Sequence, residues 1–355
     1  QQQWSTLMAF NPVFIKPARL KHKNPELKKS KVLKNAMNSI ETAVIIDLNI
    51  LSKMNQVVKG EITLNASGLK ELVKTLNNVR GLCLSPGFAL NEAESSYVSD
   101  LYSSYETFLE RYCRDYIDHP GAIKTKLEKE SHVKFKELPV GEKYVNSITY
   151  LTIIKTQLIS RKNQDLSPQE QFCKLIGFLA EKADMIGAVE VEAAKFVFFN
   201  TAEVQDVRFR AYCKKIKDNF KKGGNSSDKL LAKCLNAARD IVYYRITAGQ
   251  QNTYIDGKMQ DCWLLTADDG LVNLTNSIYF VPQGDGQDSK YVTFQRNKEQ
   301  EKSQYWQYCD QLQEKTVKER HREHYAFTES DFEKLFEVIN GLENEIRGLF
   351  VESAV

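Results

Sequence analysis

The stretch AVIIDLNIL, residues 43–51, decides the fold that the sequence predicts. Its first part, Val44–Asp47, is apolar and β-branched up to a single carboxylate, and polar residues flank it. A short strand that is apolar on both faces is typical of a parallel sheet covered by helices. Apolar residues then continue at helical spacing, which predicts a helix directly after the strand. Asp47 therefore marks the carboxyl end of a buried strand, where open α/β sheets bind their ligands.

The next part of the chain predicts a βαβ unit. Ala66–Arg80 has the period of an amphipathic helix, Gly81 ends it, and Leu82–Leu84 is a second apolar strand. Parallel strands joined in this way cross over with a right hand. A new helix then begins and carries Glu92 about one turn from its start. Glu92 is thus expected at the same edge of the sheet as Asp47.

Two further acidic positions lie in the second half of the chain. Asp240 occurs on a predicted helix, Ser227–Thr247, where its neighbours on the helix are apolar. Asp268 and Asp269 follow the apolar, strand-like run Trp263–Thr266. In a doubly wound sheet the ends of these strands flank the point where ligands bind, so Asp47 and Asp268 are expected on adjacent strand ends.

Several carboxylates that converge on one pocket are what two-metal hydrolysis of a phosphodiester requires. Mg²⁺ prefers oxygen ligands and keeps several of its waters. Grouped carboxylates repel one another, which raises their pKa values and favours a bound cation. The candidate catalytic residues are therefore Asp47, Glu92, Asp240 and Asp268, and the candidate metal ligands are these four together with Asp269.

Each acid also has a purely structural interpretation. Asp47 can cap the helix that follows it, Glu92 and Asp240 can be ordinary helix residues, and Asp268-Asp269-Gly270 has the form of a turn. The combination is more specific than any single member, because each acid follows or faces a predicted strand end.

These motifs resemble the PIN-like family of metal-dependent nucleases over about residues 43–100 and 227–283. In that family the first strand ends in an Asp with a small polar residue two positions later, which Asp47 and Asn49 match. The last strand ends in Thr-x-Asp, which Thr266 and Asp268 match, and the two helix acids correspond to Glu92 and Asp240. The 28-residue step from Asp240 to Asp268 is longer than in small members of the family, and Asp256 and Asp261 are the nearest substitutes for Asp240.

The resemblance implies a nuclease that depends on Mg²⁺ or Mn²⁺. A single-stranded RNA substrate is favoured over DNA, in a toxin–antitoxin or defence setting. It also implies an α/β fold with a small parallel, doubly wound, PIN-like sheet. The pattern of apolar residues along the chain adds a large helical insertion within this fold and a helical C-terminal tail. The expected domains are a basic arm (1–40), a nuclease domain (41–285, with the insertion at about 100–225) and a charged helical region (286–355).

The basic residues indicate where a polyanion would bind. The net charge is only +3, but residues 1–40 hold eight cations and one acid, a local charge of +7. A second basic cluster, Arg208–Lys222, lies near the end of the insertion. Such clusters favour nucleic acid, although each can also be a solvated face. The residues expected to bind substrate are Asn49, Thr266, Lys214, Lys215, Lys221 and Lys222.

Composition indicates a cytoplasmic protein with no membrane partner. No apolar stretch approaches the roughly 20 residues that cross a bilayer, and residues 1–9 lack the pattern of a signal peptide. The seven cysteines are scattered singly, which is typical of reduced thiols. The expected partners are RNA, a protein that inhibits the nuclease or forms a complex with it, and a second copy of the chain.

Two other classes of function compete with the nuclease. The first is an inactive PIN-like subunit that binds RNA or another protein. The second is a phosphatase that uses Asp47 as a nucleophile, but Asn49 occupies the second position of the DxD motif that such enzymes need. The sequence contains no GxxxxGK[ST], GxGxxG or GxSxG motif, so NTPase, dinucleotide-binding and serine-hydrolase functions have no support.

Overall fold

The chain forms two compact units in the computed structural model. The first consists of residues 1–132 and 243–268, and the second of residues 133–242 and 269–355. The structure describes residues 10–19, 25–117, 134–255, 257–282, 290–320 and 328–352. Asp256, which we considered as a substitute for Asp240, and residues 1–9 and 20–24 of the expected arm lie outside these ranges.

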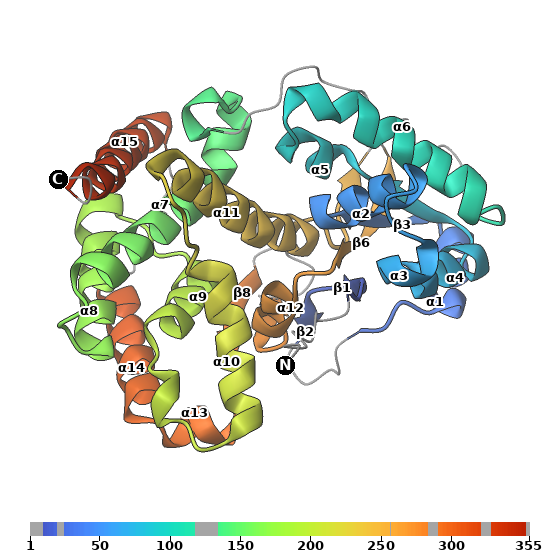
Figure 1. Ribbon diagram of the computed structural model, residues 1–355. Coiled ribbons are helices and arrows are strands. Elements are labelled where there is room, and N and C mark those ends of the chain that lie inside the picture. Colours follow the sequence, from blue (N-terminus) through green and yellow to red (C-terminus); the bar gives the residue numbers. More distant parts are fainter. Residues whose placement is uncertain are drawn as a thin grey trace, which may run out of the picture. The chain divides into compact units, whose positions relative to one another are not determined.

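A five-stranded sheet forms the centre of the first unit (Figure 1). Strand β3 (Ile40–Ile46) lies between β4 (Leu82–Ser85) and β6 (Lys258–Thr266), and both neighbours run parallel to it. Strands β1 (Val13–Ile15) and β5 (Tyr254–Ile255) pair antiparallel with β6. The prediction of a mixed α/β protein with a parallel sheet centre is confirmed, and β1 shows that part of the expected arm belongs to the sheet.

Helices of the first unit share one hydrophobic core with this sheet. Val44 and Ile46 of β3 and Trp263 and Leu265 of β6 pack in one core with Met54 and other apolar residues of the helices. The remaining elements of the first unit are β2 (Ala18–Arg19), α1 (Lys29–Met37), α2 (Leu48–Val58), α3 (Leu64–Ser67), α4 (Lys70–Asn78), α5 (Gly87–Glu92) and α6 (Ser95–Tyr112).

The single helix predicted for Ala66–Arg80 is wrong, because Gly68 divides it. Gly68 has φ +76°, a left-handed conformation that ends α3 and that side chains with a Cβ rarely adopt. A Cβ at this position would also overlap the carbonyl group of Phe10. The apolar period continues across the break, so periodicity alone could not reveal it.

The aromatic residues at four-residue spacing in α6 form a packing face. Tyr105 and Phe108 are buried in the core of the first unit. Tyr116, just beyond the helix, donates a hydrogen bond from its hydroxyl to the carbonyl oxygen of Leu82 at 2.9 Å. These rings are therefore part of the packing inside the unit. Tyr97, near the start of the same helix, is 55% exposed.

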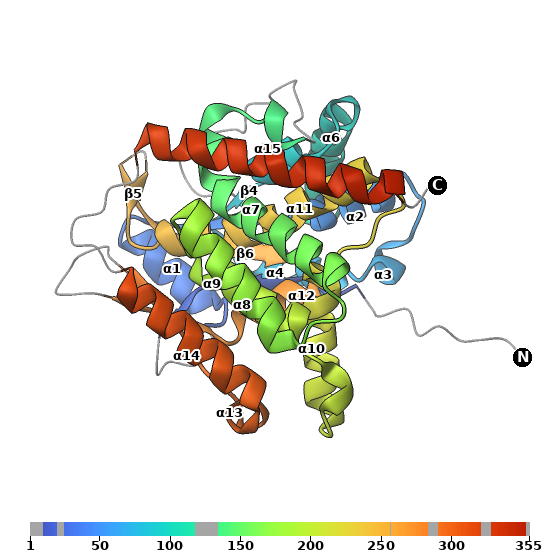
Figure 2. The same cartoon turned by 90° about the vertical axis from the view of Figure 1, so that its left-hand side faces the viewer.

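Helices make up most of the second unit. Figure 2 shows α15 (Glu329–Glu352) running beside α7 (Val140–Lys162), and α7 also packs on α8 (Pro168–Phe178) and α9 (Ala188–Phe198). Ser167 and Glu170 form a capping box at the start of α8. The remaining elements are η1 (Phe135–Glu137), the π-helical turn Leu179–Ala183, η3 (Thr201–Glu203), α10 (Val207–Phe220), α12 (Asp269–Thr275), β7 (Ile278–Pro282), β8 (Lys290–Phe294), α13 (Lys298–Lys302) and α14 (Gln304–Glu319). Helix α11 (Ser227–Gly249) contributes residues to both units.

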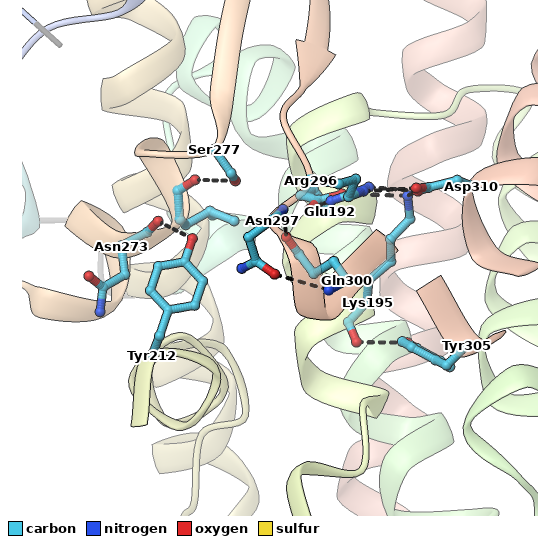
Figure 3. A network of polar contacts seen from close by, with 11 residues as sticks. Glu192, Lys195, Tyr212, Asn273, Ser277, Arg296, Asn297, Gln300, Tyr305 and Asp310 are labelled. Atoms are coloured by element: carbon cyan, nitrogen blue, oxygen red, sulfur yellow. Dashed lines mark hydrogen bonds and ion pairs between the residues drawn. The ribbon is translucent and has the colours of Figure 1, made fainter. Parts of the chain in front are cut away.

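A buried network of four charged side chains joins three segments of the second unit (Figure 3). Arg296 donates to both carboxylate oxygens of Glu192, at 2.5 and 2.9 Å, and to both oxygens of Asp310, at 2.6 and 2.8 Å. Lys195, only 1% exposed, donates to Asp310 at 2.6 Å and lies 3.4 Å from Glu192. The two positive and two negative charges balance, which makes their burial tolerable.

None of the helices in the described ranges is long and apolar enough to cross a membrane.

Candidate functional site

Asp47 stands at the carboxyl edge of the sheet, beside the end of β6. Ile46, the last residue of β3, pairs with Leu265 in the parallel register. The backbone N–H of Asp47 donates to the carbonyl oxygen of Leu265 at 3.0 Å. Because both strands run in the same direction, Asp47 and the segment Thr266–Asp268 leave the sheet at the same edge.

Hydrogen bonds connect the two strand ends. The hydroxyl of Thr266 donates to Asp47 Oδ2 at 2.5 Å, and Asn49 Nδ2 donates to the same oxygen at 2.7 Å. Asn49 Oδ1 accepts from the backbone N–H of Ala267 at 3.2 Å, and Thr266 Oγ1 accepts from the backbone N–H of Asp268 at 3.0 Å. Asn49 and Thr266, which we expected to bind substrate, thus orient Asp47 and fix the loop that leads to Asp268.

Asp47 is also the N-cap of α2. Its Oδ1 accepts from the backbone N–H of Asn49 at 3.3 Å, so Asp47 does cap the helix that follows it. The helix N-terminus stabilises negative charge there. A carboxylate offers about four acceptor positions, and Oδ2 receives the two short contacts of Asp47. Oδ1, whose hydrogen bond is longer, is therefore the atom that can accept a further ligand.

Burial raises the pKa of Asp47 above its ordinary value of 3.8. The hydrogen bonds from Thr266 and Asn49 act in the opposite direction, and the negative charge of Asp268 raises the pKa further. Asp47 is 6% exposed whereas Asp268 is half-buried. Asp47 and Asp268 follow adjacent parallel strands at the same edge of the sheet, and neighbouring carboxylates of this kind favour a bound cation.

Glu92 ends helix α5, which follows β4, the other parallel neighbour of β3. The helix packs against β3 and α2, and Glu92 is 9% exposed. Phe88 of the same helix contacts the ring of Tyr243, with ring centroids 5.2 Å apart. Glu92 is therefore a buried helix residue and not a solvated one.

The expected group of converging acids is not preformed. Within the described part of the chain, no three His, Cys, Asp or Glu side chains lie close enough together to hold a metal ion. The parallel register of β3 and β6 instead brings a pair of acids, Asp47 and Asp268, to adjacent strand ends.

The two remaining candidate ligands lie in the second unit. Asp240 is a half-exposed residue of α11, one turn before Tyr243. Asp269 begins α12, and its carboxylate accepts a hydrogen bond from Lys215 Nζ at 2.8 Å. Asp269 is thus engaged by a cation of the protein itself.

The basic cluster divides into cations with internal contacts and cations that face solvent. Lys215 binds Asp269, and Lys222 Nζ donates to Asn219 Oδ1 at 2.5 Å. Lys214 lies on α10 and Lys221 directly follows the end of this helix, and both are exposed. Lys214 and Lys221 are therefore two members of this cluster that can contact a polyanion.

The sequence did not predict a second buried polar group at the other end of the same strands. Asp261 lies in β6 and is 6% exposed, and it accepts hydrogen bonds from Lys16 Nζ and, at 2.6 Å, from Asn35 Nδ2. Asp261 therefore does not replace Asp240 at the carboxyl edge. The sequence signal for this group is Asp261 directly before the apolar run CWLL, since a carboxylate at the start of a buried strand needs a polar partner.

Comparison of the chain with protein-family models, with curated proteins and with solved structures finds no match.

Proposed function

We propose that the protein is a divalent-metal-dependent nuclease with a PIN-like, doubly wound arrangement of β4, β3 and β6. The observation that carries the proposal is the pair Asp47 and Asp268 at adjacent strand ends, connected by Thr266 and Asn49. This is the position at which open α/β sheets bind ligands. Single-stranded RNA is the favoured substrate.

The residues of the carboxyl edge fit Mg²⁺ or Mn²⁺. Asp47 and Asp268 supply the hard oxygen ligands that such ions prefer, and one or two carboxylates suffice when water and substrate phosphates complete the shell. A bound ion would polarise a phosphoryl oxygen and lower the pKa of a bound water. Thr266 and Asn49 hold Asp47 in one orientation, because both side chains donate to Oδ2 and leave Oδ1 the freer oxygen.

Glu92 and Asp240 are assigned supporting roles in this proposal. Glu92 is buried next to the same sheet, and its carboxylate suits the positioning of a water. The assignment of Asp240 as a fourth residue of the site stays a prediction. Asp269 is not assigned as a metal ligand in this proposal, because its carboxylate accepts a hydrogen bond from Lys215.

Cleavage of a mixed pool of single-stranded RNA and DNA tests the proposal. Wild-type protein is expected to cleave RNA only with Mg²⁺ or Mn²⁺, and Asp47→Asn and Asp268→Asn are each expected to lower the rate at least about 100-fold. The matched control is Asp115→Asn, an exposed acid of the same unit, which should cleave at the wild-type rate. Cleavage by Asp47→Asn that equals the control would exclude the proposed site.

The basic cluster is tested separately by the salt dependence of RNA binding. Lys214→Glu with Lys221→Glu should weaken binding and reduce the slope of log affinity against log salt by roughly 1.4, about 0.7 for each lost phosphate contact. Lys315→Glu with Lys318→Glu, on exposed positions of α14, is the control. An unchanged slope in the first variant would mean that this cluster is a solvated face.

A binding subunit without nuclease activity is the second candidate function. The observation that favours it is the capping role of Asp47, which gives the carboxylate a structural use. Metal-dependent binding of RNA without cleavage, lost in Asp268→Asn, would identify this function.

A further inference from the structure

The first unit contains a cavity, lined by both polar and apolar residues, at the amino end of β3 and β6. Its volume is about 370 Å³, within the range of small-molecule sites. Ile40, the first residue of β3, lines it, whereas Asp47 follows the last of the seven residues of this strand. At about 3.3 Å per residue the cavity and the carboxyl edge are roughly 20 Å apart.

The wall of the cavity is built on a buried ion pair. Lys16 pairs with Asp261, which is 6% exposed and also accepts from Asn35 Nδ2 at 2.6 Å. Asn35, 1% exposed, donates to Thr42 Oγ1 at 2.9 Å as well. The ammonium group of Lys16 lies 5.3 Å from the ring centre of Trp263. These side chains are fixed before any ligand enters, which lowers the entropic cost of binding.

The cavity favours an anion. Lys31 lines it from α1, one turn before Asn35, and is exposed. Because Lys16 and Asp261 neutralise each other, Lys31 leaves a charge of +1 at the cavity. Helix α1 begins two residues earlier and has no acidic residue in its first turn, so its N-terminal dipole adds to the positive potential.

The other lining groups suit a planar polar ring. Asn252 brings an amide side chain, which can both donate and accept hydrogen bonds and so matches the edge of a nucleobase. Pro17 and Pro25 supply rigid apolar walls on which a ring can lie. Gln251 is held in place by hydrogen bonds from Nε2 to the carbonyl oxygens of Thr247 and Cys262, at 3.0 and 2.5 Å.

We propose that this cavity binds a nucleoside monophosphate, with the phosphate at Lys31 and the base edge at Asn252. Neither half of the ligand alone satisfies the cavity, because the phosphate uses only the cation and the base uses only the amide of Asn252. The inference does not rest on the nuclease proposal, since it concerns the opposite end of the strands.

Isothermal titration calorimetry tests the inference without interference from the carboxyl edge. Full-length Asp47→Asn protein, free of divalent cations, is titrated with AMP, GMP, CMP and UMP, and then with inorganic phosphate and the matching nucleosides. At least one monophosphate should bind, about tenfold or more tightly than phosphate or its nucleoside. Lys31→Ala should weaken that binding about tenfold or more, since a charge-assisted contact is lost.

Lys34→Ala is the matched control. Lys34 is exposed on the same helix as Lys31 but does not line the cavity, so its removal should leave the affinity unchanged. Asn252→Ala should weaken monophosphate binding and leave phosphate binding unchanged. Absence of binding for all four monophosphates would overturn the inference, as would equal affinities of the Lys31 and Lys34 variants. Phosphate that binds as tightly as the nucleotides would also overturn it, because the site would then select only an anion.

Discussion

At the scale of single residues, Thr266 decides how Asp47 is held. Its buried hydroxyl donates to Asp47 and accepts from the backbone N–H of Asp268, so one side chain serves both strand ends. Sequence matching indicated Thr266 as part of a motif. Its contact with Asp47, 219 positions away in the chain, is visible only in the folded sheet.

Thr266→Val is expected to destabilise the protein by about 1–3 kcal/mol, because it leaves a buried carboxylate with one donor fewer. It should also raise the pKa of Asp47 further, since this hydrogen bond lowers it. Urea unfolding and an NMR titration of the Asp47 carboxyl measure the two effects. The control is Thr247→Val, where the buried hydroxyl only donates to a helix carbonyl at 2.7 Å, and its cost should stay below about 1 kcal/mol.

Asp268→Asn should change how stability depends on pH. The folded-state pKa of Asp47 is raised above 3.8 by burial and by Asp268, so ionisation of Asp47 costs stability. That stability is fully present below pH 3.8 and is lost as the pH rises through the folded pKa. Between low and neutral pH, the Asp268→Asn variant should lose less unfolding free energy than the wild-type protein. The difference should be at most about 1 kcal/mol, because Asp268 is partly exposed and water screens its charge.

Urea unfolding at about pH 3 and about pH 7 measures this difference. The addition of Mg²⁺ at neutral pH should raise the unfolding free energy of the wild-type protein and have a smaller effect on the variant. Identical pH profiles for the two proteins would show that Asp268 does not act on Asp47.

At the scale of elements, Gly68 separates two helices that the apolar period joins. Gly68→Ala places a Cβ at positive φ and against the Phe10 carbonyl group, so we expect a loss of roughly 2–5 kcal/mol. Gly60→Ala is the matched control, because Gly60 has φ +75° and a Cβ added there would meet no atom within 4 Å. It should lose only the backbone cost of about 1–2 kcal/mol. Equal losses in urea unfolding would mean that the contact with Phe10 is unimportant.

The elements that the sequence predicted correctly are those with a strong local signal. The second half of β3, residues 43–46, and residues 82–84 of β4 are continuous apolar runs, and the capping box of α8 can be recognised in the sequence from Ser167 and Glu170. Strand β1 was missed because its three residues carry no period of their own. Its pairing partner β6 is about 250 positions away, and a pairing at that distance has no local signature.

At the scale of the whole molecule, the charged network around Arg296 ties together segments of the second unit that are distant in sequence. Arg296→Met removes one of the two cations that face Glu192, which is 0% exposed, and Asp310, and it leaves Lys195 to face both carboxylates. The removal of one member of a buried ion network leaves a negative charge uncompensated, which typically costs about 3–5 kcal/mol. Arg208→Met, at an exposed position of the same unit, should stay within about 0.5 kcal/mol of the wild type in urea unfolding. A similarly small effect for Arg296→Met would show that the network contributes little to stability.

The sequence by itself determined the mixed α/β class, the strand that ends at Asp47 and the acids that follow strand ends, because apolar periodicity and strand-end carboxylates are local properties. Only the tertiary structure decided which of these acids meet. The parallel register of β3 and β6 joins Asp47 to the segment of Asp268, whereas Asp269 turns to Lys215. The same register buries Asp261 at the opposite end with Lys16 and Asn35. Strand order and register depend on the packing of the entire core, so no local stretch of sequence can specify them.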